Sequence, residues 1–169
     1  YFILILIWPL SFMQIYTKPH TRIQATEWIQ NNIPADSTLA VEHWDDRLPL
    51  TKGEKYQYME MTLYDQPDDE RKWEVINQKL AQTDYIILSS NKLYIPLPKL
   101  TDCMKYKKCY PKTAEYYKAL FDGSLGFKKI AEFTSNPTIP IFNIQIDDQR
   151  ADESFTVYDH PKVLIFKKT

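Results

Sequence analysis

The stretch Glu42–Arg47, which reads EHWDDR, holds the densest group of side chains that could do chemistry. Carboxylates and an imidazole can hold a divalent ion or take a proton from an acceptor. The stretch follows a segment that predicts a strand, and ligands of open α/β sheets bind outside the carboxyl ends of strands. A solvated strand-to-loop exit, with Arg47 neutralising an aspartate, is the alternative. The candidate ligand or acceptor contacts are Glu42, His43, Asp45 and Asp46.

His160 is a second candidate, between Asp159 and Pro161. Asp and Pro at these positions are typical of a turn. Because no nucleophile lies near His160 in the sequence, we interpret it as a structural turn residue. The nearby acidic residues could bind a cation, although a solvated acidic turn explains them as well; they are Asp147, Asp148, Asp152 and Glu153. We therefore predict no catalytic residue and no metal site in these residues.

The two cysteines, Cys103 and Cys109, lie in the stretch CMKYKKC. Their spacing is unusual for paired zinc ligands, and no CxxC partner exists. A local disulfide would form in an oxidising compartment, whereas a reducing one would leave two ordinary thiols. We favour the disulfide.

Composition excludes several functions. The net charge is −1, from 21 basic and 22 acidic residues, and the lysines form no stripe, so we expect no nucleic-acid partner. Only three glycines occur, and neither GxGxxG nor a P-loop motif is present. With 44% hydrophobic and 25% charged residues, the chain has the composition of a folded domain.

The first sixteen residues differ from the rest, because Phe2–Met13 is apolar apart from Ser11. A membrane span needs about 20 such residues. Since the chain begins without Met, we read residues 1–16 as the end of a last transmembrane helix cut by the fragment boundary. Tyr16 and Lys18 would then mark the exit from the bilayer. A buried core helix or strand is the alternative. Residues 17–169 would form an extracytoplasmic domain whose partners are the bilayer and the upstream transmembrane part of the same chain.

Helices and strands alternate in the remaining pattern, which favours an α/β layer architecture. We expect a small layered domain with a mixed sheet flanked by helices and a C-terminal β-hairpin. Thr21 and Thr113 are expected as helix caps, and Gly123 as a helix stop. The predicted helices span residues 21–33, 68–82 and 113–123. The predicted strands span residues 38–44, 85–88, 127–135 and 139–147, with a closing hairpin of 155–158 and 162–168.

Three segments resemble a known family: TRIQATEWIQNNIPADSTLAVEHWDD, YYKALFDGSLGFKKIAEFTSNP and DDQRADESFTVYDHPKVLIFKK. They resemble the C-terminal end of YYY-type multi-pass membrane proteins. Those proteins are similar to GT-C glycosyltransferases, which include the protein O-mannosyltransferases. The resemblance implies a domain accessory to an enzyme that takes sugar from a polyprenyl-phosphate donor. It carries over no catalytic residue, because those enzymes keep their acidic residues in an early external loop. The CMKYKKC insertion departs from the family pattern.

A different class of function remains open. The chain could be a non-catalytic binding or assembly module on a membrane anchor, with EHWDD and the tyrosines as a recognition surface for a glycan or protein acceptor. Neither hypothesis requires a cofactor within these residues. A free-standing soluble enzyme is disfavoured, because the sequence shows no nucleophile–base arrangement.

Overall fold

A five-stranded mixed sheet is the centre of the molecule, with the strand order β2-β1-β3-β7-β4. The computed structural model describes residues 2–50, 55–140 and 142–169. β1 pairs in parallel with β2 and β3, whereas β7 pairs antiparallel with β3 and β4. These strands are β1 (Thr38–Glu42), β2 (Gln57–Met61), β3 (Tyr85–Leu88), β4 (Phe127–Phe133) and β7 (Val163–Lys168). The α/β class and the mixed sheet are therefore confirmed.

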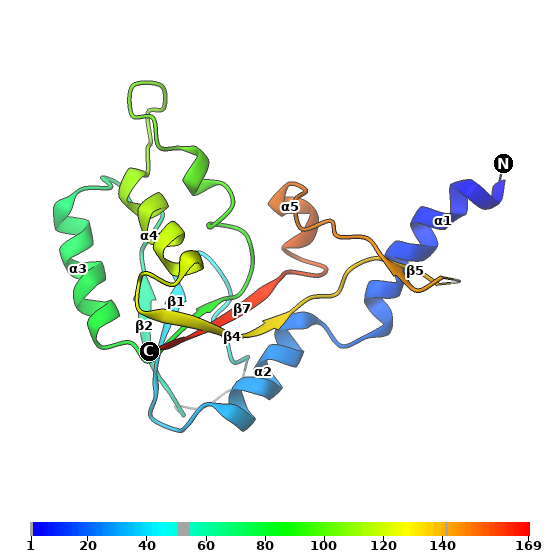
Figure 1. The fold of residues 1–169 in the computed structure, drawn as a ribbon, viewed down its shortest axis with the longest axis horizontal. Helices are drawn as coiled ribbons and strands as arrows, with labels where there is room; N and C mark the ends of the chain where they lie inside the picture. The colour runs from blue at the N-terminus through cyan, green and yellow to red at the C-terminus, as the bar shows by residue number, and fades with distance from the viewer. Residues whose placement is uncertain (1, 51–54, 141) are drawn as a thin grey trace.

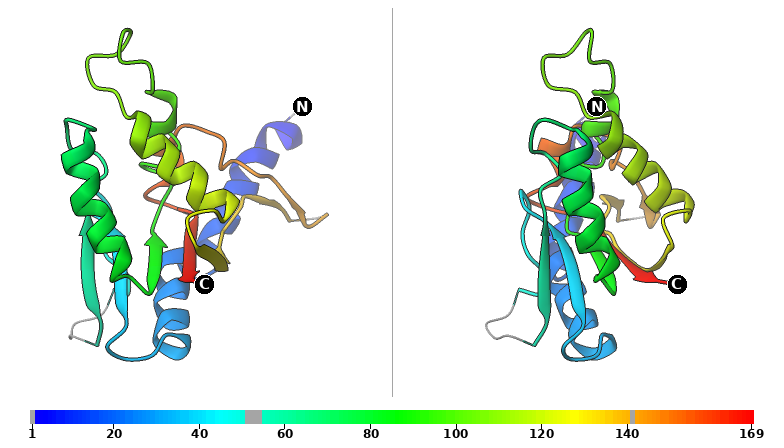
Figure 2. Two further views of the ribbon diagram at one scale, coloured as in Figure 1. Left: turned by 60° about the vertical axis from the view of Figure 1, so that its left-hand side comes forward. Right: turned by 90° about the vertical axis from the view of Figure 1, so that its left-hand side faces the viewer.

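Helices cover both faces of this sheet (Figures 1 and 2). α2 (Thr21–Asn32) packs on one face, where Ala25 and Ile29 meet Val41 and Ile165. α3 (Glu70–Ala81) and α4 (Pro111–Asp122) pack on the other face. Because both faces are covered, β1 and β3 are buried at every position, which the apolar runs Leu39–Val41 and Tyr85–Leu88 favour.

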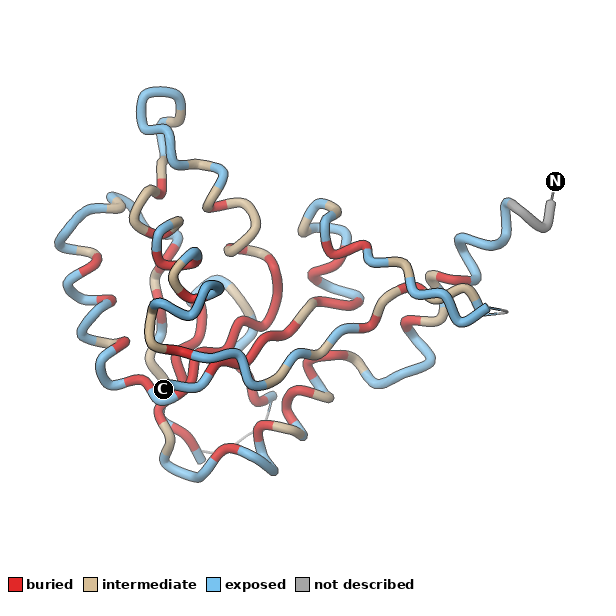
Figure 3. Tube along the Cα trace, viewed as in Figure 1, coloured by how far each residue is buried: buried red, intermediate tan, exposed pale blue. Residues whose placement is uncertain are grey.

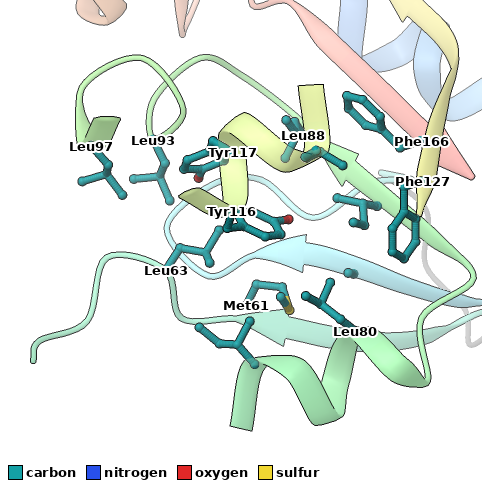
Figure 4. Close-up of a cluster of buried hydrophobic side chains, with 14 of the residues drawn as sticks. Met61, Leu63, Leu80, Leu88, Leu93, Leu97, Tyr116, Tyr117, Phe127 and Phe166 are labelled. Atoms are coloured by element: carbon teal, nitrogen blue, oxygen red, sulfur yellow. The ribbon is translucent and has the colours of Figure 1, made fainter. Parts of the chain in front are cut away.

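The larger of the two cores lies under α3 and α4 (Figure 4). Tyr116 and Tyr117 point from α4 into this core, and both are buried. Tyr116 lies close to Trp73 of α3, with the ring centroids 5.7 Å apart. The two tyrosines therefore pack inside the domain and are not displayed on its surface.

Both helix caps expected from threonines are wrong. α2 has His20 at its N-cap, and the Nδ1 atom of His20 accepts from the backbone N–H of Arg22. α4 begins at Pro111, and its Thr113 backbone N–H donates to the Oδ2 atom of Asp68. An aspartate from another segment thus caps α4, which a local sequence pattern cannot reveal. Gly123 does end α4, with a φ of 84°.

The predicted hairpin of 155–158 with 162–168 is also wrong. Asp152 caps a short helix, α5 (Glu153–Thr156), so FTVY forms no strand. β7 finds its antiparallel partners in β3 and β4 instead. The strand predicted over 139–147 is reduced to a small hairpin of β5 (Thr138–Ile139) and β6 (Ile144–Gln145). β2 was not predicted, because its sequence QYMEM mixes polar and apolar residues without β-branched ones, and the strand lies at a sheet edge.

The N-terminal residues form α1 (Phe2–Met13), followed by the 3-10 helix η1 (Gln14–Thr17). α1 projects from the body of the domain, and Figure 3 shows that much of its length is exposed. Among the residues that the structure describes, no helix has both the length and the apolar character needed to cross a bilayer. The remaining element is a second 3-10 helix, η2 (Leu97–Lys99).

Candidate functional site

The carboxyl ends of β1 and β3 lie side by side, because these strands are parallel neighbours. The chain leaves them toward opposite faces of the sheet. After β1, Leu48 packs in the core beneath α2. After β3, Leu93 and Leu97 pack in the core beneath α3 and α4. Diverging connections of this kind leave a crevice at the strand ends, which is where open α/β sheets bind ligands.

Arg22 of α2 ties the two strand ends together. One guanidinium nitrogen lies 2.9 Å from Asp45 Oδ1, and the other lies 2.8 Å from Asp46 Oδ2. Its Nε–H donates to the carbonyl oxygen of Ser89 at 3.3 Å. The Ser90 hydroxyl donates to Asp45 Oδ2. The Asp45 side chain, only 3% exposed, therefore has both of its oxygens engaged.

A shallow crevice of about 320 Å³ opens over these groups, and we call it the polar crevice. His43 at its rim lies 3.2 Å from Glu60, between Nδ1 and Oε2, and its ring meets the edge of the Trp44 ring. A cation entering here would compete with Arg22 for both aspartates. The residues around the polar crevice are Arg22, His43, Trp44, Asp45, Asp46, Lys92, Val157 and Tyr158.

Glu42 does not line the polar crevice, because it is buried on the α4 side of the sheet. The Tyr117 hydroxyl donates to its Oε1 atom at 2.5 Å, and its Oε2 atom is buried without a hydrogen-bond partner. Burial raises the pKa of Glu42 to about 8; the hydrogen bond from Tyr117 lowers it, and the charge of Asp45 raises it. Glu42 is therefore mostly protonated at neutral pH.

A second hollow, of about 460 Å³, adjoins the polar crevice, and we call it the aromatic cleft. Trp44 and Lys92 line both hollows. The Trp44 ring meets the Tyr64 ring edge to face at 5.8 Å, and Tyr64 stacks on Tyr110 at 5.7 Å. The lining of the aromatic cleft consists of Trp44, Tyr64, Lys92, Leu93, Pro96, Leu97, Leu100 and Glu153.

The structure thus brings three of the four predicted contacts together and separates the fourth. His43, Asp45 and Asp46 share the polar crevice, whereas Glu42 lies beneath it in the core. Sequence reasoning missed Arg22, Tyr64 and Lys92. One feature of the sequence could have indicated Arg22. A cation in the first turn of a helix interacts unfavourably with the helix dipole, so a contact with other residues is needed to stabilise it there.

His160 and the acidic run form a separate buried group. The His160 side chain is fully buried, and its Nε2 atom lies 2.8 Å from Asp148 Oδ2. Its ring packs edge-on against Phe12 of α1 and Phe155 of α5. Asp147 accepts from the backbone N–H of Gln149. His160 therefore links α1 to the domain, in a packing role.

Cys103 and Cys109 are joined by a disulfide, with their Cα atoms 5.1 Å apart. The bridge closes the base of the loop that projects beyond α4 (Figure 1). Comparison of the chain with protein-family models, with curated proteins and with solved structures finds no match.

Proposed function

We propose that residues 17–169 form a non-catalytic extracytoplasmic domain, held at a membrane by residues 1–16, that is accessory to a GT-C-like glycosyltransferase using a polyprenyl-phosphate-linked sugar. The observation that carries membrane attachment is the surface of α1. Ile5, Leu6, Trp8, Leu10 and Met13 are all exposed. A helix that is apolar on nearly all sides is stable inside a large core or in lipid, and an apolar surface of this kind marks an interaction site.

Two further features support the proposal. The Cys103–Cys109 disulfide suits an oxidising compartment outside the cytoplasm. The groups of the polar crevice are engaged with one another: Arg22 holds Asp45 and Asp46. Such carboxylates are poorly prepared for general acid–base chemistry, which requires a group free to exchange a proton with the substrate. A supporting role in binding therefore fits this site better than catalysis.

Flotation with phosphatidylcholine vesicles tests the membrane attachment. We expect the chain of residues 1–169 to float with the vesicles. A variant with Leu6→Ser, Leu10→Ser and Met13→Ser should remain in the dense fraction. The control carries Ile23→Ser, Val75→Ser and Met104→Ser, which change exposed apolar residues elsewhere. Failure of the unaltered chain to float would refute the attachment.

The accessory role is tested in the complete protein by measuring sugar transfer from a polyprenyl-phosphate donor. His43→Gln and Asp46→Asn should each change the rate less than about tenfold, because loss of a general acid or base usually costs 10²–10⁴-fold, roughly. A loss within that larger range, with folding intact, would make the polar crevice catalytic and would overturn the accessory role.

The aromatic cleft favours a second candidate function, a membrane-anchored module that binds a glycan. Trp44 and Tyr64 present ring faces and edges on which an apolar sugar face can pack, and Lys92 and Glu153 supply polar groups at the rim. Titration with manno-oligosaccharides, followed by calorimetry, should show saturable binding that Trp44→Ala removes. Phe142→Ala, at an exposed aromatic residue outside the cleft, should leave binding intact. No saturable change in the unaltered chain would exclude these glycans as ligands.

A further inference from the structure

Two segments that lie far apart in the sequence lack charged side chains. The first is residues 1–17, which end before Lys18. The second is residues 135–146, with the sequence SNPTIPIFNIQI, between Glu132 and Asp147. In a chain with 25% charged residues, an uncharged stretch of twelve residues on the surface of a domain calls for a physical reason.

The fold places the described parts of these two segments side by side. β5 contacts α1, and the Ser135 hydroxyl donates to the carbonyl oxygen of Ile15 at 3.4 Å. β5 and β6 pair with Ile139 opposite Ile144, and Asn143 turns the chain with a φ of 51°. Figures 1 and 2 show the hairpin and α1 projecting together from the domain.

The described tip of the hairpin presents apolar side chains to the surroundings. Phe142 is 71% exposed and Ile144 is 53% exposed. Figure 3 shows this end of the hairpin as exposed, beside the exposed part of α1. The two apolar surfaces are therefore neighbours, and a single apolar surrounding could cover both.

We propose that the hairpin of β5 and β6 inserts Phe142 and Ile144 into the interfacial layer of the lipid bilayer that holds α1. This inference rests on the proposed membrane attachment. The insertion is shallow, because a two-stranded hairpin has unpaired backbone groups at its edges that the hydrocarbon interior would not solvate. Pro137 and Pro140 reduce this cost, since neither carries a backbone N–H.

The absence of charge determines which lipids suffice. Without a lysine or arginine in residues 135–146, the hairpin needs no anionic headgroup, and its insertion is driven by burial of apolar surface. Neutral phosphatidylcholine should therefore be enough. Raising the salt concentration should not release the hairpin, whereas it would weaken an electrostatic contact.

An environment-sensitive fluorophore tests the insertion on the chain of residues 1–169 with its disulfide intact. A cysteine for labelling is placed at Phe142, at Leu10 of α1 or at Val75 of α3, all of which are exposed. With phosphatidylcholine vesicles, labels at 142 and 10 should shift to shorter wavelength and be quenched by brominated lipid. The label at 75 should stay in water.

The outcomes separate this inference from the attachment on which it rests. Quenching at position 10 without quenching at 142 overturns the hairpin insertion and leaves the attachment standing. Quenching at neither position overturns both. A shift at 142 that needs no lipid and grows with protein concentration would mean that a second copy of the chain covers the hairpin, which also overturns the inference.

A substitution provides a second measurement. With the label moved to Ile144, Phe142→Asp should lower the quenching by about tenfold, because it replaces an aromatic ring in contact with lipid by a charge. Phe142→Leu should retain most of the quenching, and Phe142→Asp should leave a label at Leu10 unaffected. Equal quenching in the Asp and Leu variants would show that the side chain at position 142 does not drive the insertion, which would overturn its role in this inference.

Discussion

The polar crevice and the projecting arm differ in how their side chains are paired. The projecting arm consists of residues 2–17, 135–140 and 142–146. In the crevice, the guanidinium of Arg22 is matched by Asp45 and Asp46. In the arm, Leu10 and Phe142 are apolar and exposed, and the described residues do not cover them. The charged groups of the crevice are thus paired with one another in water, whereas the arm presents a surface suited to an apolar environment. Variants can break or sharpen this contrast.

Removing Arg22 should have the largest effect on stability. Arg22→Met leaves Asp45 buried without its cation, and breaking one side of a buried ion pair costs about 3–5 kcal/mol. Equilibrium unfolding in urea measures this loss. The double variant Arg22→Met with Asp45→Asn removes both charges and should recover much of the stability.

Arg71→Met is the matched control, because Arg71 is an exposed arginine of α3. It should change the free energy of unfolding by about 0.5 kcal/mol or less. If Arg22→Met were equally mild, the groups of the polar crevice would not depend on one another, and the contrast with the arm would fail.

Glu42 should make stability depend on pH. Its pKa in the folded state is about 8, against 4.5 for the ordinary side chain, so the folded state retains a proton that the unfolded state has lost. Stability should therefore fall as pH rises between about 5 and 8, by up to about 1.4 kcal/mol per pH unit. Unfolding measured across this range should show the slope.

Glu42→Gln replaces this titrating carboxyl group by an amide that does not titrate. The variant should keep the hydrogen bond from Tyr117 and unfold with a flatter pH dependence, so that it is more stable than the unaltered chain above pH 8. Glu27→Gln, at an exposed carboxylate of α2, should leave the slope as it was. An unchanged slope in Glu42→Gln would mean that another group titrates.

Asp68 should give a smaller effect with the opposite pH dependence. Burial raises its pKa, but hydrogen bonds from Lys72, Trp73 and Thr113 outweigh that effect and hold the pKa below its usual value. Its contribution is present above about pH 4 and is lost as pH falls through the lowered folded-state pKa. Asp68→Ala should cost about 2–3 kcal/mol at pH 7, because it leaves the donors of α3 and α4 without an acceptor.

A urea midpoint at pH 7 measures this loss, and repeating it at pH 3 should show a smaller difference between variant and unaltered chain. Asp69→Ala provides a comparison at the neighbouring residue, whose side chain caps α3 and accepts from the backbone N–H of Lys72. Its cost should be about 1 kcal/mol, that of one exposed cap. Equal losses for the two variants would contradict a network centred on Asp68.

Local patterns predicted the elements whose own residues decide their structure. The helix expected over 68–82 occurs at Glu70–Ala81, because Trp73, Ile76 and Leu80 recur on one face. The strand Tyr85–Leu88 has the predicted bounds, because its apolar run is short and continuous. FTVY was misread because Asp152 caps a helical turn there, and a hydrogen bond then outweighs strand propensity.

The candidate site was harder to predict, because its contacts cross long stretches of sequence. His43, Trp44, Asp45 and Asp46 of the EHWDD stretch line a crevice at the end of β1, and their predicted role as ligand or acceptor contacts stays a prediction. The ion pair of Asp45 depends on Arg22, which is 23 residues away in the sequence. The buried hydrogen bond of Glu42 depends on Tyr117, which is 75 residues away. No local sequence pattern reveals partners that lie so far apart in the chain. A buried carboxylate and a crevice carboxylate therefore look alike in the sequence.

The smallest effect on stability is expected at Met13 inside the arm, and Ile15, two residues further on, provides the contrast. Met13 is exposed, whereas Ile15 is buried against the domain. Met13→Ser should change the free energy of unfolding by about 0.5 kcal/mol or less, as is usual at the surface. Ile15→Ser should cost about 2 kcal/mol or more, because it empties a packed position and buries a hydroxyl.

Urea unfolding without lipid distinguishes two explanations for the apolar surface of the arm. If Met13→Ser is neutral in water yet weakens flotation with vesicles, its apolar side chain contributes to a contact outside the chain and not to the fold. If Met13→Ser costs as much as Ile15→Ser, then α1 packs its outer face on the protein in solution. The apolar side chains of the arm would then pack within the protein, as the charged groups of the polar crevice pair within it. The arm would no longer support attachment to a bilayer.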